Sequence, residues 1–182
     1  MSDPRSPGPK PSGATDPAAA PPTSSAESAH QRIFLVVVDE SEELKLALRY
    51  AARRAQHTGG RVAMLYVIEP SDLQQWMAVE SLMREERREE AEALLQKLAS
   101  EVAEQSGSMP IIHIREGRRR DELLALIDEE PSISILVLAA STRSEGPGPL
   151  ITALTGKFAS KLHIPVTIVP GSLSEAQIDV LA

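Results

Sequence analysis

Five short, largely apolar runs alternate with helical patterns, and this alternation constrains the fold of the chain most. The runs have strand length and lie at residues 33–38, 61–68, 110–114, 133–138 and 166–169. A strand that is apolar at nearly every position is buried on both faces, as in a parallel sheet covered by helices. Helical spacing of apolar residues fills the connections, at residues 44–59, 73–105, 121–129 and 150–162.

Five strands in alternation with four helices predict a three-layer α/β sandwich with a Rossmann- or flavodoxin-like parallel sheet. We assign this domain to residues 31–171 and a short C-terminal tail to residues 172–182. Residues 1–30 differ in composition, since they hold seven of the 14 prolines among Ala, Ser, Gly and Thr. A segment with no apolar pattern buries too little surface to offset its ordering entropy, so we expect a disordered tail there.

Composition excludes several classes of function. With 26 acidic and 19 basic residues the net charge is −7, which argues against general nucleic-acid binding because that needs a basic face. The chain has no cysteine, which rules out disulfides, thiolate metal sites and cysteine nucleophiles and is compatible with the cytoplasm. The four histidines show no metal-ligand spacing, and no apolar run approaches the ~20 residues of a membrane span.

Doubly wound sheets bind ligands at the carboxyl ends of their strands, which directs attention first to Asp39. This residue follows the first strand, where its carboxylate can accept a hydrogen bond from a ribose hydroxyl or an adenine amino group. Asp39 and Glu42 also have the D-x-x-E spacing of a helix capping box. Both roles are compatible with the sequence, and neither excludes the other.

The loop after the fourth strand, residues 139–149, is the second candidate position. Its hydroxyl side chains, the Arg143 guanidinium and the start of the next helix suit an anion. Pro147 and Pro149 have no N–H group, however, so the loop offers fewer backbone donors than a phosphate cradle. An ordinary turn with a helix cap is the alternative interpretation.

Other motifs in the sequence give weaker indications of function. Gly156-Lys157 does not form a P-loop, because Ile151 and Phe158 stand where that motif requires Gly and Ser or Thr. The three arginines 118–120 either add positive potential at the same sheet edge or lie on a solvated loop. No set of residues pairs a nucleophile with a base, so we expect no enzyme activity.

Taken in order, several segments resemble the universal stress protein family. The resemblance covers about residues 32–170. It depends on Val-Val-Asp-Glu-Ser at 37–41, Met-Leu-Tyr-Val at 64–67, Ile-Leu-Val-Leu-Ala at 135–139 and Ile-Pro-Val-Thr-Ile-Val-Pro at 164–170. It implies an adenine nucleotide alpha hydrolase-like sheet of order 3-2-1-4-5, a homodimer, and a regulatory role in the bacterial stress response. We expect the dimer to form through the fifth strand, where Thr167 and Val169 would otherwise leave an unpaired backbone ladder.

The resemblance also implies nucleotide-binding positions. One branch of the family binds ATP through G-x-x-G, nine residues and G-[ST] after the fourth strand, and another branch lacks this motif. Without gaps, the three glycines fall on Ala139, Thr142 and Thr152; Gly146 and Gly148 can serve instead if the loop carries an insertion or deletion. The family positions that frame ribose and adenine are retained as Val38, Asp39 and Val67, and Arg143 is also retained in the loop after the fourth strand.

Glycines permit close approach of a phosphate and a positive φ, which the branched Thr142 resists. We therefore expect weak or altered binding of ATP or AMP by a cytoplasmic regulatory protein with an unknown partner. The alternative is a dimeric interaction protein that binds no nucleotide, and a nucleotide-processing enzyme is the least supported interpretation.

Overall fold

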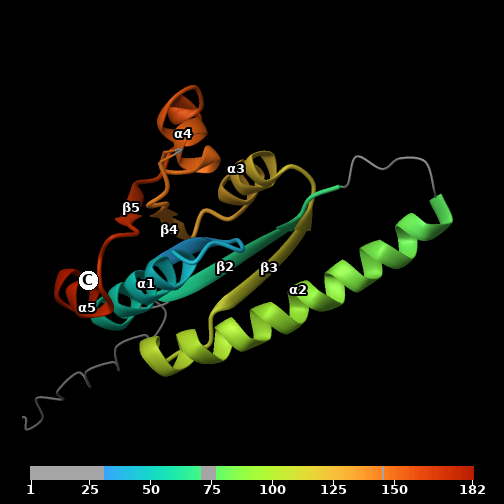
Figure 1. The fold of residues 1–182 in the computed structure, drawn as a ribbon. Coiled ribbons are helices and arrows are strands. Elements are labelled where there is room, and N and C mark those ends of the chain that lie inside the picture. The colour runs from blue at the N-terminus through green and yellow to red at the C-terminus, as the bar shows by residue number, and fades with distance from the viewer. Residues whose placement is uncertain (1–30, 71–76, 145) are drawn as a thin grey trace, which may run out of the picture.

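The computed structural model describes residues 31–70, 77–144 and 146–182, which form one α/β domain (Figure 1). The predicted tail at 1–30 lies outside the described residues. Strands and helices alternate along the chain: β1 (Ile33–Val38), α1 (Leu44–Thr58), β2 (Arg61–Ile68), α2 (Met77–Ser106), β3 (Ile111–Glu116), α3 (Arg119–Glu129), β4 (Ile133–Ala140), α4 (Pro149–Thr155), a 3₁₀ turn (Ala159–Lys161), β5 (Val166–Pro170) and α5 (Glu175–Leu181).

The five strands form one parallel sheet of order β3-β2-β1-β4-β5, which confirms the predicted topology. β1 is the central strand, and all six of its residues are buried. It pairs with β2 on one side and with β4 on the other, so the order of the strands reverses next to it. The carboxyl ends of β1 and β4 therefore flank the topological switch point, where ligands of such sheets bind.

Alternate residues of β1 contribute to two separate cores. Phe34, Val36 and Val38 pack with α1, α2 and α5 on one face. Ile33, Leu35 and Val37 pack with α3 and α4 on the other face. Because successive side chains of a strand point to opposite faces, a continuous apolar run requires helices on both sides of the sheet.

The junction between α1 and β2 depends on the pair Gly59-Gly60. Gly59 ends α1 in the left-handed conformation, with φ of 66°, which glycine adopts without steric cost. At Gly60 a β-carbon would lie 2.5 Å from the carbonyl oxygen of Arg32, so no side chain fits there. Arg61 donates to the same carbonyl at 2.8 Å, which starts the pairing of β2 with β1.

Two predicted elements differ from the structure. The helix predicted at 150–162 is wrong in its second half, because α4 ends at Thr155 and only a 3₁₀ turn follows. Gly156 interrupts it, since glycine disfavours a helix interior. β3 is half-exposed rather than buried on both faces, because it forms one edge of the sheet.

The residues that we set apart as a C-terminal tail contain a docked helix. Ser174 precedes α5 as its N-cap and forms a capping box with Gln177. Its Ile178 is fully buried in the core beside α1. Because α5 is short and only this side chain is fully buried, polar contacts must contribute to its attachment.

Arg49 and Arg53 of α1 bind α5 through Asp179. The Arg49 Nε and Nη2 atoms donate to the two carboxylate oxygens at 2.9 and 2.6 Å, and Arg53 Nε donates at 2.9 Å. These hydrogen bonds, that of Arg49 first, lower the pKa of Asp179 from 3.8 to about 2. A paired bidentate arginine is the strongest common arrangement for a carboxylate near the surface.

We expect Asp179→Asn to loosen α5, because the asparagine cannot hold two guanidinium groups as a carboxylate does. Amide hydrogen exchange of α5 at pH 7 should become faster, while exchange in β1 stays unchanged. The matched control is Glu175→Gln, which removes one exposed pair with Arg49 at 2.8 Å and should have a smaller effect. Equal exchange rates in the two variants would contradict this assignment.

The same contact predicts a pH dependence. Asp179 has a lower pKa in the folded state than when unfolded, so its stabilisation is complete above about pH 4 and is lost as the pH falls toward 2. The difference in stability between the native chain and Asp179→Asn, measured by denaturant unfolding, should therefore shrink over this range. A difference that stays constant from pH 6 to pH 2.5 would show that the carboxylate does not carry the contact.

Candidate functional site

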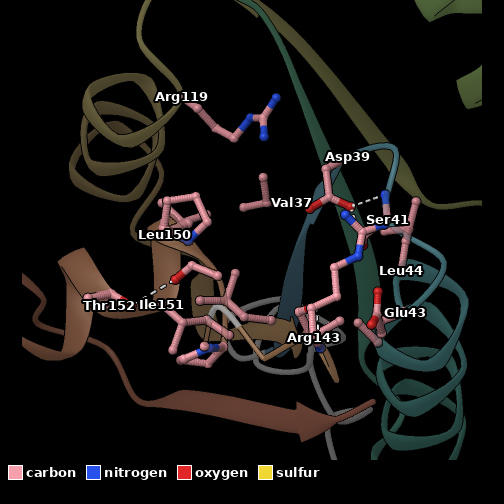
Figure 2. A pocket seen from close by; sticks show the side chains of 18 of the residues that line it. Val37, Asp39, Ser41, Glu43, Leu44, Arg119, Arg143, Leu150, Ile151 and Thr152 are labelled. Carbon is pink, nitrogen blue, oxygen red and sulfur yellow. Dashed lines mark hydrogen bonds between the residues drawn. The ribbon is translucent and has the colours of Figure 1, made fainter.

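A cavity with a volume of about 1020 Å³ lies at the switch point (Figure 2). Its wall is formed by the ends of β1 and β4, the start of α1, the β4–α4 loop and the first residues of α3 and α4. Two distant segments of the sequence, near residue 40 and near residue 145, thus face each other across it. The size suits a small organic ligand.

Asp39 lies directly after β1 and lines this cavity. Its Oδ1 atom accepts hydrogen bonds from the backbone N–H of Ser41, at 3.0 Å, and from the Ser41 hydroxyl. The capping box predicted for Asp39 and Glu42 is wrong, because α1 begins only at Leu44 and Asp39 is too far from its first turn. The carboxylate instead closes a short turn and keeps its second oxygen at the cavity.

The seven predicted site residues fall into two groups. Asp39, Ala139, Arg143 and Thr152 line the cavity, while Val38, Val67 and Thr142 do not. The two valines do not line the cavity because of the direction in which their strands point them. Val38 packs in the core under α1 and α2, and Val67 is buried in the core under α3 and α4. The neighbouring Val37 lines the cavity in place of Val38.

The Arg143 side chain extends toward Asp39 and Ser41 (Figure 2). Thr152 lies in α4, and its hydroxyl donates to the Gly148 carbonyl oxygen at 2.9 Å. A second guanidinium, that of Arg119, reaches the cavity from the start of α3. The sequence interpretation left the role of residues 118–120 open.

The position of Arg119 at the cavity could have been predicted from the order of the strands. The residues after β2 and β3 meet at the same sheet edge as those after β1 and β4. Glu69, just beyond β2, accepts from the Arg119 backbone N–H at 3.2 Å and pairs with its Nη2 at 3.2 Å. Arg119 Nε is buried and has no partner among the described residues.

The β4–α4 loop uses its backbone donors internally. Ser141 N–H donates to the Pro147 carbonyl oxygen at 3.2 Å, and Gly146 N–H donates to the Arg143 carbonyl oxygen at 3.3 Å. Arg143 N–H donates to the Ser141 hydroxyl oxygen at 3.2 Å. Pro147 and Pro149 have no N–H to offer.

Two glycines of this loop nevertheless have backbone conformations that other residues rarely adopt. Gly146 and Gly148 have φ of 105° and 111°, and both line the cavity. A β-carbon at either position would meet nothing within 4 Å. Positive φ rather than close packing therefore explains these two glycines, each of which lies four residues from the nearest position of the ungapped family motif.

The backbone N–H of Thr142, in the same loop, is bound by a carboxylate. Glu43 Oε1 accepts from the Thr142 backbone N–H at 3.0 Å and from its hydroxyl at 3.3 Å. This backbone hydrogen bond is the largest of the effects that lower the pKa of Glu43 below its ordinary value. Glu43 is therefore ionised at neutral pH.

The charges around the cavity are mixed. Asp39, Glu40 and Glu43 contribute carboxylates, and Arg119 and Arg143 contribute guanidinium groups. No cluster of three His, Asp or Glu side chains suited to a metal ion occurs among the described residues. No helix in the described ranges is long and apolar enough to span a membrane.

Several solved structures with the same fold are universal stress proteins. One is UspA from Lactobacillus plantarum, with 20% identity and a TM-score of 0.66, covering 78% of this chain and 99% of that one. A universal stress protein in complex with cAMP has 17% identity and a TM-score of 0.54, with coverage of 79% and 100%. The protein from Archaeoglobus fulgidus in complex with dAMP has 18% identity and a TM-score of 0.52, with coverage of 76% and 97%.

No curated protein matches this chain in sequence. The sequence model described as "Universal stress protein family" matches residues 31–170, which span β1 through β5 and include every strand of the sheet. This match covers most of the chain and includes both sides of the cavity. The chain belongs to the universal stress protein family.

Proposed function

We propose that this chain is a cytoplasmic regulatory protein of the bacterial stress response that binds an adenine nucleotide weakly in the cavity at the switch point. The observation that carries the proposal is the cavity itself, which joins the ends of β1 and β4 in a family whose members include nucleotide complexes. We assign a regulatory rather than a catalytic role, since the Ser41 hydroxyl at the cavity is bound to the Asp39 carboxylate and no histidine lines the cavity among the described residues.

The side chains around the cavity support a nucleoside ligand. Val37 and Ile151 offer apolar surface for a planar base, and Asp39 offers a carboxylate oxygen for ribose hydroxyl groups. Arg143, which extends toward Asp39, supplies a cation close to the same position (Figure 2). Small-molecule sites usually combine apolar surface with a few placed polar groups, and this cavity has both, with the polar surface the larger.

The phosphate end of the proposed site is weaker. Phosphates are commonly held by backbone N–H groups of a glycine-rich loop. Here Ser141, Thr142, Arg143 and Gly146 already donate to acceptors of the same chain. Nucleotides with few phosphates fit these residues best, and the cAMP and dAMP held by two structural neighbours are both monophosphates.

The same loop favours a second candidate function. A loop whose Ser141, Thr142, Arg143 and Gly146 amides all donate to acceptors of the same chain needs no ligand for these groups, which suits a dimeric interaction protein that binds no nucleotide. Titration with nucleotides separates the two functions directly.

We expect adenosine, AMP and ATP to bind with dissociation constants between micromolar and millimolar, as measured by isothermal titration calorimetry with and without Mg²⁺. Asp39→Asn should weaken adenosine and AMP about tenfold, because a hydrogen bond to a charged group contributes ~1.5–3 kcal/mol. Asparagine can keep the turn that Asp39 forms with Ser41.

The control for this experiment is Glu42→Gln, which removes an exposed carboxylate that does not line the cavity. Its affinities should equal those of the native chain. Absence of heat and of any thermal shift at millimolar nucleotide would favour the interaction protein. Release of ADP, AMP or phosphate during incubation, if abolished by Asp39→Ala, would instead establish an enzyme.

We also propose a homodimer through β5. This strand is the second edge of the sheet, its backbone ladder is paired only with β4 among the described strands, and Ile168 is 39% exposed. An exposed edge strand with an apolar side chain is prone to pair with another chain.

Light scattering at high micromolar concentration should therefore give twice the mass of 19.7 kDa. Ile168→Lys should shift the protein toward the monomer, because it places a charge at the proposed interface. Met109→Lys, which changes an exposed side chain before β3 at the opposite edge of the sheet, should leave the dimer intact. A native monomer at this concentration would contradict the proposal.

A further inference from the structure

Glu43 lines the cavity, and its carboxylate binds a backbone amide of the β4–α4 loop. It is the residue before α1 and has helical backbone angles, yet its side chain makes no capping bond to that helix. The carboxylate instead crosses to the β4–α4 loop and accepts both hydrogen bonds that Thr142 can donate. Residues 99 positions apart are joined by this contact.

Close packing around Gly171 holds the Glu43 side chain in place. Gly171 follows β5 and donates to the Ala140 carbonyl oxygen at 3.0 Å. A β-carbon at this position would lie 2.6 Å from Glu43 Cγ and 3.0 Å from Thr142 Cγ2. The Glu43 stem thus packs against backbone, and the ends of β4 and β5 and the start of α1 all contribute to its position.

The carboxylate is charged while it occupies this position. The hydrogen bond from the Thr142 backbone lowers the pKa of Glu43, so protonation does not remove the charge at neutral pH. An oxygen of a phosphate that approached the Thr142 N–H would meet a like charge already bound to it. Ser141, Arg143 and Gly146 donate within the loop, and residues 147 and 149 are prolines, so these five positions offer no backbone donor to further phosphates.

We propose that the Glu43 carboxylate is an anion bound permanently to the β4–α4 loop, and that it makes the cavity select adenosine and nucleoside monophosphates over triphosphates. This specificity rests on the nucleotide binding proposed above. The carboxylate substitutes for a phosphate at the Thr142 amide and repels a further one. A nucleoside has no group that competes for this amide. A triphosphate reaches it only by displacing Glu43.

Two substitutions at Glu43 separate the effect of its negative charge from the effect of its hydrogen bonds to Thr142. Glu43→Gln removes the charge and retains an oxygen that can accept from Thr142. Glu43→Ala removes both. The ratio of the dissociation constants for ATP and AMP should fall about threefold in Glu43→Gln and about tenfold or more in Glu43→Ala, a tenfold change being ~1.4 kcal/mol. The affinity for adenosine should change by less than about twofold in either variant, as no phosphate is involved.

Glu40→Gln is the matched control, because Glu40 is an exposed carboxylate that lines the same cavity and makes no hydrogen bond within the described chain. It removes the same unit of charge but leaves the Thr142 amide bound. Its ratio for ATP and AMP should stay within about twofold of the native value, well below the change in Glu43→Ala. An equal change in Glu40→Gln and Glu43→Ala would overturn the proposal, since general repulsion would then explain the selectivity.

The amide of Thr142 supplies a readout that needs no nucleotide. In ¹H–¹⁵N spectra its resonance should shift, and its hydrogen exchange should accelerate, in Glu43→Ala but not in Glu40→Gln. An unchanged Thr142 amide in Glu43→Ala would overturn the proposal whatever the affinities. If adenosine and AMP bind but the ratio for ATP and AMP is unaffected by Glu43→Ala, the inference fails and the proposed function stands. If no adenine compound binds to the native chain or to Glu43→Ala, both this inference and the proposed function fail.

Discussion

Burial of β1 on both faces is the constraint on which the rest of this structure depends. All six of its residues are buried, and they alternate between the two cores. A central strand of this kind requires neighbours on both edges and helices above and below. The reversal of strand order next to it then brings the ends of β1 and β4 together, so the cavity is a consequence of the topology rather than of any one residue.

Much of this fold could be predicted because the signals are local and continuous. The bounds of β1 and β2 agree with their apolar runs, and the sheet order follows from the family resemblance. The predictions were wrong where long-range contacts decide the outcome. α5 has only seven residues, and it is held by Ile178 and by two arginines that lie in α1. A local pattern carries no information on such a contact.

The candidate site was predictable in its position but only partly in its members. Asp39, Ala139, Arg143 and Thr152 line the cavity because they lie at or beyond the ends of strands or on the loop and helix that face it. Val38 and Val67 do not, because the direction of a strand side chain depends on register. Glu43 was missed, since a glutamate at the start of a helix usually interacts with that helix and its contact with Thr142 spans 99 positions. A simple motif search shows that the glycines are missing. It cannot detect that a carboxylate binds the loop amide in place of a phosphate.

The contact between Glu43 and Thr142 makes the effects of substitutions at these positions depend on one another. The donor at residue 142 belongs to the backbone, so a change of its side chain to glycine restores flexibility but leaves the amide bound to Glu43. A change at Glu43 alone frees the amide but leaves a branched residue in the loop. A loop able to grip a triphosphate therefore requires both changes, and neither change by itself reveals the effect of the pair. The same dependence extends to Gly171, where any side chain would meet Glu43 and Thr142 at once.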